Sequence, residues 1–199
     1  MSTGTLHVDR EGPIGYVTID NPTRRNAISA EMWRAFPRVL GELDADRAVR
    51  CIVLRGAGDH AFAAGADISE FERNRADSTA TRAYEEATGA AHLALENSPK
   101  PVIAQIHGFC MGGGLAIALS CDLRYCADDA QFAIPAARLG VGYGLHGHRR
   151  LVATVGHANA REIMFSARRY DALEASAIGL VNRVVGRAEL ADYVAGFAF

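Results

Sequence analysis

The sequence lacks the features that mark several large protein classes. Its 199 residues include only six prolines and one tryptophan, and 21 Lys and Arg nearly balance 23 Asp and Glu. The net charge of -2 argues against a nucleic-acid-binding protein, which would carry a strong basic excess. No stretch approaches the ~18 apolar residues of a membrane span, and the N-terminus has no signal-peptide pattern. We therefore expect a cytoplasmic protein without membrane or nucleic-acid partners.

Cysteine is also scarce, and its spacing matches neither a zinc site nor a disulfide framework. The four cysteines each sit among apolar neighbours, and only Cys121 and Cys126 lie close together. This pattern predicts free, buried thiols in a reducing compartment. It gives no support to a bound metal.

Short apolar runs alternate with helical patterns along the chain, which favours one α/β domain with a largely parallel sheet flanked by helices. A hairpin is expected over 6–20, with Glu11-Gly12-Pro13 as its turn. Ser29 is expected to cap a helix that runs through Leu43. The further strands are expected at 51–54, 102–106, 123–127, 131–134 and 180–185, and the further helices at 79–97, 115–120, 146–155, 158–166 and 173–178.

Two small-residue loops each follow a predicted strand. They are His60–Ile68, which contains Ala64-Gly65-Ala66, and His107–Leu115, which contains Gly112-Gly113-Gly114. Consecutive glycines allow a ligand to approach the backbone, and the second loop opens a helix whose first N–H groups are unpaired. One N–H from each loop could bind a single carbonyl oxygen as an oxyanion hole. The alternative is that both loops are only tight strand-to-helix turns.

A third segment, Gly56–Ala61, fits the spacing of a dinucleotide-binding fingerprint, with Asp77 further along the chain. That fingerprint requires a helix to start within it. The Ala- and Gly-rich residues that follow are unsuited to a helix, so we expect no nicotinamide or flavin cofactor.

The two loops together resemble the paired signatures of the enoyl-CoA hydratase/isomerase (crotonase) superfamily. Four further landmarks before and after the loops agree, and all stand in the family order: Arg25-Asn26-Ala27-Ile28, Cys121-Asp122-Leu123-Arg124, Ala130–Pro135 and Gly179-Leu180-Val181. The resemblance implies a crotonase-like spiral of β-β-α turns that holds an acyl-CoA thioester. Coenzyme A would then be part of the substrate, with no separate cofactor and no metal.

The same resemblance implies where the thioester lies. Its oxygen would be bound by the backbone N–H groups of Ala66 and Gly113, and an enolate-like anion would be stabilised there. The adenine end of CoA would lie near Ala64, Ala66, Asp67 and Ile68. Arg24 and Arg25 are candidates for a CoA phosphate, because guanidinium pairs well with phosphate oxygens. A solvated basic turn is the alternative for the arginines, and a helix cap is the alternative for Asp67.

The chain departs from the family where hydration needs two glutamates. The matching positions are Ala116, on the helix after the glycine loop, and Ala136, just after the Phe-x-x-Pro segment. Alanine cannot transfer a proton, so efficient hydration of a simple enoyl-CoA is not expected. A non-catalytic acyl-CoA-binding protein is one alternative.

Another alternative is a decarboxylase acting on a malonyl-type acyl-CoA. Tyr143 stands where the family's methylmalonyl-CoA-type decarboxylases place a tyrosine, and His146 or His148 could assist it. The alternative for Tyr143 is a packed aromatic whose hydroxyl bonds to the backbone. Gly144 replaces the aspartate of the family's dehalogenases, which argues against that chemistry.

The last residues are interpreted as part of a further region. Residues 1–187 would form the acyl-CoA-binding core, and 188–199 would begin a truncated C-terminal helical region. In the family that region closes the acyl pocket and builds the trimer. A homotrimer or dimer of trimers is expected if the region is complete. Phe197 and Phe199 would otherwise form an uncovered apolar patch, so they dock on something or the chain is cut short.

Overall fold

An N-terminal hairpin forms one edge of the larger of two sheets. In the computed structural model, which describes residues 4–74 and 76–198, β1 (Thr5–Glu11) pairs antiparallel with β2 (Ile14–Asp20). Gly12 turns the chain between them at φ 56°, a conformation that glycine adopts without strain. The predicted hairpin is therefore confirmed.

The remaining strands of the larger sheet run parallel to β2. They are β3 (Cys51–Gly56), β5 (Val102–Ile106), β7 (Leu123–Ala127) and β10 (Arg183–Val185), and the sheet order is β1-β2-β3-β5-β7-β10. Almost every residue of β3 and β5 is buried, as in parallel strands covered on both faces. The predicted, largely parallel sheet is confirmed.

A second, smaller sheet has the order β4-β6-β8-β9. Its strands are β4 (Ala61–Ala63), β6 (Phe109–Met111), β8 (Gln131–Ala133) and β9 (Tyr170–Asp171). β4 and β6 lie within the two segments predicted as loops. The successive pairs β3–β4, β5–β6 and β7–β8 therefore place one strand in each sheet before the chain enters a helix, which makes the repeating β-β-α turns of the spiral.

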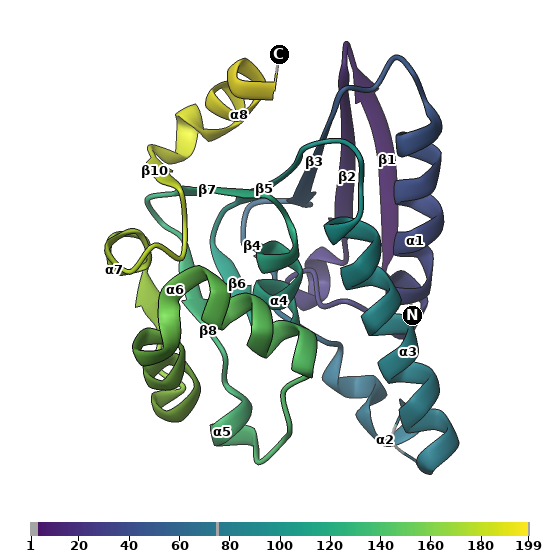
Figure 1. Cartoon of the computed structure of the whole chain (residues 1–199), viewed down its shortest axis with the longest axis vertical. Helices are drawn as coiled ribbons and strands as arrows, with labels where there is room; N and C mark the ends of the chain where they lie inside the picture. Colours follow the sequence, from purple (N-terminus) through teal and green to yellow (C-terminus); the bar gives the residue numbers. More distant parts are fainter. Residues whose placement is uncertain (1–3, 75, 199) are drawn as a thin grey trace.

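Four long or central helices surround these sheets (Figure 1). They are α1 (Ala30–Ala45), α3 (Ser78–Glu96), α4 (Gly113–Ser120) and α6 (Leu145–Ser166). α1 and α4 contact strands directly, α3 packs on α1 and α4, and α6 packs on α4. Ser29 caps α1 as predicted, because its side chain accepts a hydrogen bond from the Met32 amide. Gly156, at φ 75°, interrupts α6, so this element corresponds to the two predicted helices.

Short helices complete the fold. They are η1 (Pro22–Arg24), η2 (Ile68–Glu70), α2 (Phe71–Asn74), α5 (Ala136–Leu139), α7 (Ala172–Ala177), η3 (Arg187–Glu189) and α8 (Leu190–Ala198). On α8, Phe197 packs edge-on against the Tyr125 ring with 5.3 Å between centroids. Phe199 lies outside the described residues. Within residues 4–74 and 76–198 no helix has the length and apolar character to cross a bilayer.

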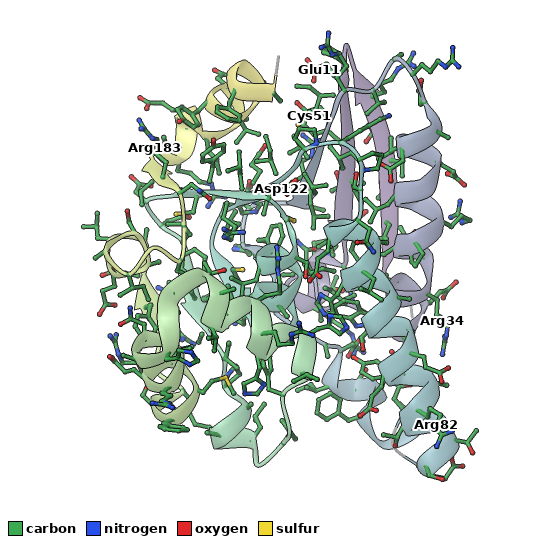
Figure 2. All side chains as sticks on the ribbon, in the orientation of Figure 1. Glu11, Arg34, Cys51, Arg82, Asp122 and Arg183 are labelled. Carbon is green, nitrogen blue, oxygen red and sulfur yellow. The ribbon has the colours of Figure 1, made fainter. Side chains whose placement is uncertain are left out.

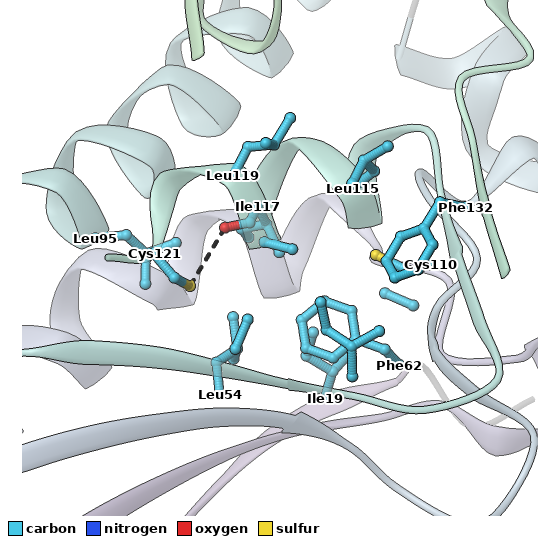
Figure 3. Packing of buried hydrophobic residues seen from close by; sticks show 14 of the residues in the cluster. Ile19, Leu54, Phe62, Leu95, Cys110, Leu115, Ile117, Leu119, Cys121 and Phe132 are labelled. Carbon is cyan, nitrogen blue, oxygen red and sulfur yellow. Dashed lines mark hydrogen bonds between the residues drawn. The ribbon is translucent and has the colours of Figure 1, made fainter. Parts of the chain in front are cut away.

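The core is centred on α4, which is apolar and buried on all sides (Figure 3). Leu115, Ile117 and Leu119 belong to this cluster, and the Cys121 thiol donates to the Ile117 carbonyl at 3.5 Å. All four cysteines are free and buried, as predicted. Burial raises the pKa of the Cys51 thiol to about 11, so these thiols are unreactive at neutral pH.

Charged side chains are confined largely to the outer surface. Arg34 on α1 and Arg82 on α3 point away from the protein (Figure 2). Asp122 is exposed, and its carboxylate accepts a hydrogen bond from the Val102 amide at 2.8 Å. Arg124, by contrast, is buried, and it donates to the carbonyls of Leu180 and Cys121.

Candidate functional site

A cavity of about 750 Å³ opens where three segments meet. The loop after β4, the N-terminus of α4 and the chain leading into α6 enclose it, and α3 forms another wall. Both predicted small-residue loops contribute to the lining. The lining includes Ala64, Gly65, Ala66, Ile68, Gly112, Gly113, Ala116, Ala136, Tyr143 and His146.

The Ala66 N–H points away from the backbone of Ile28, which runs alongside it. The Gly65 carbonyl accepts from the Ile28 amide at 2.7 Å, and the Asp67 amide donates to the Ile28 carbonyl at 3.0 Å. Successive peptide groups of an extended chain point to opposite sides. The N–H of Ala66 therefore points away from Ile28, on the side left free for a ligand.

The second amide belongs to Gly113, the first residue of α4, whose N–H has no acceptor within the helix. A Cβ atom on Gly113 would lie 3.3 Å from the Ala66 nitrogen, and one on Gly65 would lie 3.4 Å from the Gly113 nitrogen. The two amides are therefore close neighbours at the wall of one cavity. Two such donors beside a helix N-terminus can stabilise a developing oxyanion.

The two alanines that replace the expected glutamates also line this cavity. Ala116 and Ala136 are 4% and 7% exposed, so a side chain at either position would face the cavity or the core. Among the lining residues that the structure describes, the single carboxylate is that of Glu85, an exposed residue of α3. The buried part of the lining therefore offers phenol, imidazole, indole and amide groups instead of carboxylates.

Tyr143 is held by a hydrogen bond to the backbone, and its ring occupies space that is open because residue 147 is glycine. Its hydroxyl donates to the Gly112 carbonyl at 3.2 Å, and burial raises the pKa of this phenol well above its ordinary value. A Cβ atom on Gly147 would fall 2.5 Å from Cε1 of the ring, so glycine makes room for it. His148 lies behind Tyr143 and does not line the cavity; its Nδ1 is 3.1 Å from the Tyr143 carbonyl oxygen.

A second histidine lines the cavity, and no sequence pattern pointed to it. His92 on α3 is 7% exposed, and its ring stacks on that of His146 with 6.2 Å between centroids and 13° between planes. Its Nδ1 lies 3.0 Å from the Ser120 hydroxyl. Burial, and secondarily His146, lowers the pKa of His92 to about 4. A lone histidine on a helix gives no motif, so only the fold reveals its position.

The residues assigned to CoA divide into two groups. Ala64, Ala66 and Ile68 line the cavity, whereas Arg24, Arg25 and Asp67 lie outside its lining. Arg24 donates to the Asp67 carboxylate at 2.8 Å, and that carboxylate caps η2 through the Ser69 amide at 3.0 Å. Asp67 therefore has the structural role that was its alternative interpretation.

Arg25 remains at the surface beside this group. It adopts φ 52°, and its guanidinium lies 5.0 Å from the centroid of the Phe109 ring. Its carbonyl accepts from the Ala64 amide at 2.9 Å, which ties the basic turn to the first loop. Both arginines are exposed, so their remaining N–H donors are accessible to a phosphate.

The segment that resembles a dinucleotide fingerprint does not form the required structure. After Gly56 the chain enters β4 and not a helix. Asp77, the acidic residue of the pattern, caps α3 by accepting from the Ala80 amide at 2.8 Å. The geometry opposes a dinucleotide site here.

Comparison with known proteins finds similarity over nearly the whole chain. Residues 9–198 match the family model described as enoyl-CoA hydratase/isomerase. A short-chain-enoyl-CoA hydratase of Clostridium acetobutylicum is 38% identical over 191 residues, which are 96% of this chain and 72% of that protein. A peroxisomal Delta(3,5)-Delta(2,4)-dienoyl-CoA isomerase of Arabidopsis thaliana is 36% identical, over 92% of this chain and 70% of that protein.

A solved structure gives the same result for the fold. The crystal structure of an enoyl-CoA hydratase/carnithine racemase from Magnetospirillum magneticum superposes with a TM-score of 0.94 at 38% identity. The match covers 99% of this chain and 74% of that one. The spiral and its two loops therefore have a close counterpart among solved structures.

Proposed function

Because this chain belongs to the enoyl-CoA hydratase/isomerase family, we propose that it binds an acyl-CoA thioester with the carbonyl oxygen between the amides of Ala66 and Gly113. The observation that carries this proposal is the adjacency of those two amides at the wall of one cavity. The arginines of the basic turn, Arg24 and Arg25, would meet the CoA phosphates outside it.

The chemistry that such a pair supports is formation of an enolate. When a bond to the thioester's Cα breaks, either a proton passes to a base or carbon dioxide departs, and the electron pair moves onto the carbonyl oxygen, which becomes an anion. Fixed N–H donors stabilise that anion more than the neutral carbonyl, and each is worth about 2.7–4 kcal/mol of the barrier. Stabilisation of the anion requires only backbone groups, so it survives the loss of both glutamates.

The relatives bear the names of hydratases and isomerases, and these reactions differ in what they need beyond the enolate. Water addition requires a group that activates the water and a group that supplies a proton. Ala116 and Ala136 can do neither. We propose that this chain carries out an enolate-forming reaction other than ordinary carboxylate-assisted hydration.

Decarboxylation of a malonyl-type thioester is the second candidate. The observation that favours it is His146 in the cavity lining, whose imidazole N–H can orient a substrate carboxylate by a hydrogen bond. The bond between Cα and the carboxylate carbon breaks, carbon dioxide leaves, and the electron pair forms the enolate. Cα then takes a proton from water, so no strong base is needed.

Product analysis by mass spectrometry tests the proposal. The protein is incubated separately with crotonyl-CoA and methylmalonyl-CoA, and calorimetry measures the binding of butyryl-CoA. Binding with slow or absent hydration is expected. Hydration of crotonyl-CoA at an ordinary enzymatic rate would contradict the argument from the alanines. Binding without turnover of any thioester would indicate a binding protein. The homotrimer stays a prediction, which light scattering tests.

A further inference from the structure

We propose that His92 is the proton acceptor of this cavity, and that its Nε2 removes the Cα proton of a bound acyl-CoA thioester. The proposal rests on the proposed function, because it needs the thioester oxygen at the two amides. It adds a residue and a step: a base on α3 in place of a carboxylate on α4.

The position of His92 relative to the oxyanion site is fixed through Trp33. A Cβ atom on Gly113 would lie 3.4 Å from Cζ2 of the indole, and the indole and imidazole centroids are 5.6 Å apart. One aromatic ring therefore contacts both the oxyanion glycine and the imidazole. A thioester bound at the amides would place its acyl carbons in the part of the cavity that these rings line.

The hydrogen bonds of Ser120 select the useful tautomer of His92. The Ser120 hydroxyl lies 3.3 Å from the Glu96 carboxylate and 3.3 Å from the Ala116 carbonyl, and both of these groups can only accept. The hydroxyl donates to one of them and accepts from Nδ1–H of His92. The lone pair is then on Nε2, which has no partner among the described residues.

The hydrogen-bonded pair of His92 and Ser120 lies beside Ala116, the position where a catalytic carboxylate is absent. Ser120 lies one helical turn after Ala116 on α4, so the two share a face. His92 thus approaches the region that a side chain at Ala116 would have occupied. The imidazole takes over a task that the helix α4 does not perform in this chain.

The surroundings of His92 keep its imidazole neutral. Among the described residues, its ring and hydrogen-bonding partners are the uncharged Trp33 of α1, Ser120 of α4 and His146 of α6. Glu96 on its own helix is bound by Arg150 of α6 at 3.5 Å. The pKa of about 4 is close to the ordinary glutamate value of about 4.3. At neutral pH the ring is therefore an unprotonated base whose strength resembles that of a carboxylate.

The proposed step balances as a simple proton transfer. The Cα–H bond breaks, its electron pair forms the enolate, and the proton becomes the Nε2–H of an imidazolium. Return of a proton from the exchanged imidazolium restores the thioester. In D₂O, this reversal replaces hydrogen by deuterium at Cα without any overall reaction.

Hydrogen exchange of butyryl-CoA in D₂O, followed by mass spectrometry, is the test. The intact protein is expected to deuterate Cα, and His92→Gln is expected to slow this at least about 100-fold while the calorimetric Kd for butyryl-CoA stays unchanged. His157→Gln, an exposed histidine of α6 outside the cavity lining, is the matched control. Ser120→Ala keeps the imidazole of His92 but removes the hydrogen bond that orients it. This variant should slow exchange about threefold to tenfold and shift the pH profile of exchange.

The possible results separate this inference from the proposed function. Exchange that survives His92→Gln, or butyryl-CoA binding without exchange in the intact protein, overturns the role of His92 but leaves the thioester site standing. Failure to bind butyryl-CoA at all overturns both. If His92→Gln unfolds the protein, the pH profile of Ser120→Ala decides, because a merely structural serine would leave that profile in place.

Discussion

The main-chain nitrogen of Ala66 lies 3.3 Å from the point at which a Cβ atom of Gly113 would sit. Gly113→Pro removes one of the two N–H donors while placing proline at the first position of α4, where its fixed φ suits a helix. We expect butyryl-CoA exchange to fall about 100- to 1,000-fold relative to Gly113→Ala, with exchange rates as the measurement.

Gly113→Ala is the matched control because it keeps the N–H and adds only the crowding of a side chain. Circular dichroism of both variants would show that α4 persists. Equal rates for the alanine and proline variants would mean that the Gly113 amide does not bind the oxyanion.

Restoring the missing carboxylates should create hydratase activity. In the double variant Ala116→Glu with Ala136→Glu, two proton-transfer groups would face a cavity that already holds the amide pair. We expect crotonyl-CoA hydration to rise at least about tenfold, although burying the carboxylates will lower stability. The measurement is loss of crotonyl-CoA absorbance. The corresponding glutamine double variant has nearly the same size and no base, so a similar rise there would refute the interpretation.

Much of the larger sheet could be predicted because its strands are buried apolar runs with clear boundaries. Val102 to Ile106 and Leu123 to Ala127 begin and end where they were expected. β4 and β6 could not be predicted, because they are three residues long and consist of small or mixed residues within glycine-rich segments. Their strand character comes from pairing with each other in the smaller sheet, and no local pattern encodes that contact.

The same distinction applies to the site. Ala66 and Gly113 were predictable, since their loops carry a sequence signature. His92 was not, because its role depends on three helices meeting: α3 carries it, α4 supplies Ser120, and α6 supplies His146.

Two helical glycines should respond in opposite directions to the same substitution. A Cβ atom at Gly147 would fall 2.5 Å from Cε1 of Tyr143, whereas one at the exposed Gly41 of α1 would meet nothing within 4 Å. We expect Gly147→Ala to lower the free energy of unfolding by about 1–3 kcal/mol, and Gly41→Ala to raise it by up to about 1 kcal/mol. Urea denaturation measures both. Stabilisation by Gly147→Ala would show that Tyr143 is not packed as described.

His92 should make stability depend on pH between about 6.5 and about 4. In the unfolded chain its imidazole takes up a proton below its ordinary pKa of 6.5, while the folded protein resists protonation down to about 4. The unfolded state then binds more protons, so the free energy of unfolding falls as the pH is lowered through this window, by up to about 3 kcal/mol.

Urea denaturation at pH 7 and pH 4.5 of the unmodified protein and His92→Gln would isolate this contribution. Other titrating groups, including the carboxylates of Asp46 and Asp67, are common to both proteins. The glutamine variant should lose less stability on acidification, whereas the exposed His157→Gln variant should behave like the unmodified protein. Identical pH dependence in all three would show that His92 is not buried in its neutral form.

The basic turn provides the last test, because phosphate binding there should depend on the CoA moiety and not on the acyl group. Arg24 keeps donors free beside its bond to Asp67, and Arg25 is exposed above Phe109. Substituting either by alanine should raise the Kd for butyryl-CoA about 3- to 10-fold, a modest effect because solvent screens exposed charges. Butyryl-pantetheine lacks the nucleotide phosphates, so its Kd should be the same for variant and unmodified protein. Arg38→Ala, on α1 beside Glu42, should change neither constant. A loss of affinity shared by both ligands would mean that the arginines support the loop at Ala64 and do not contact phosphate.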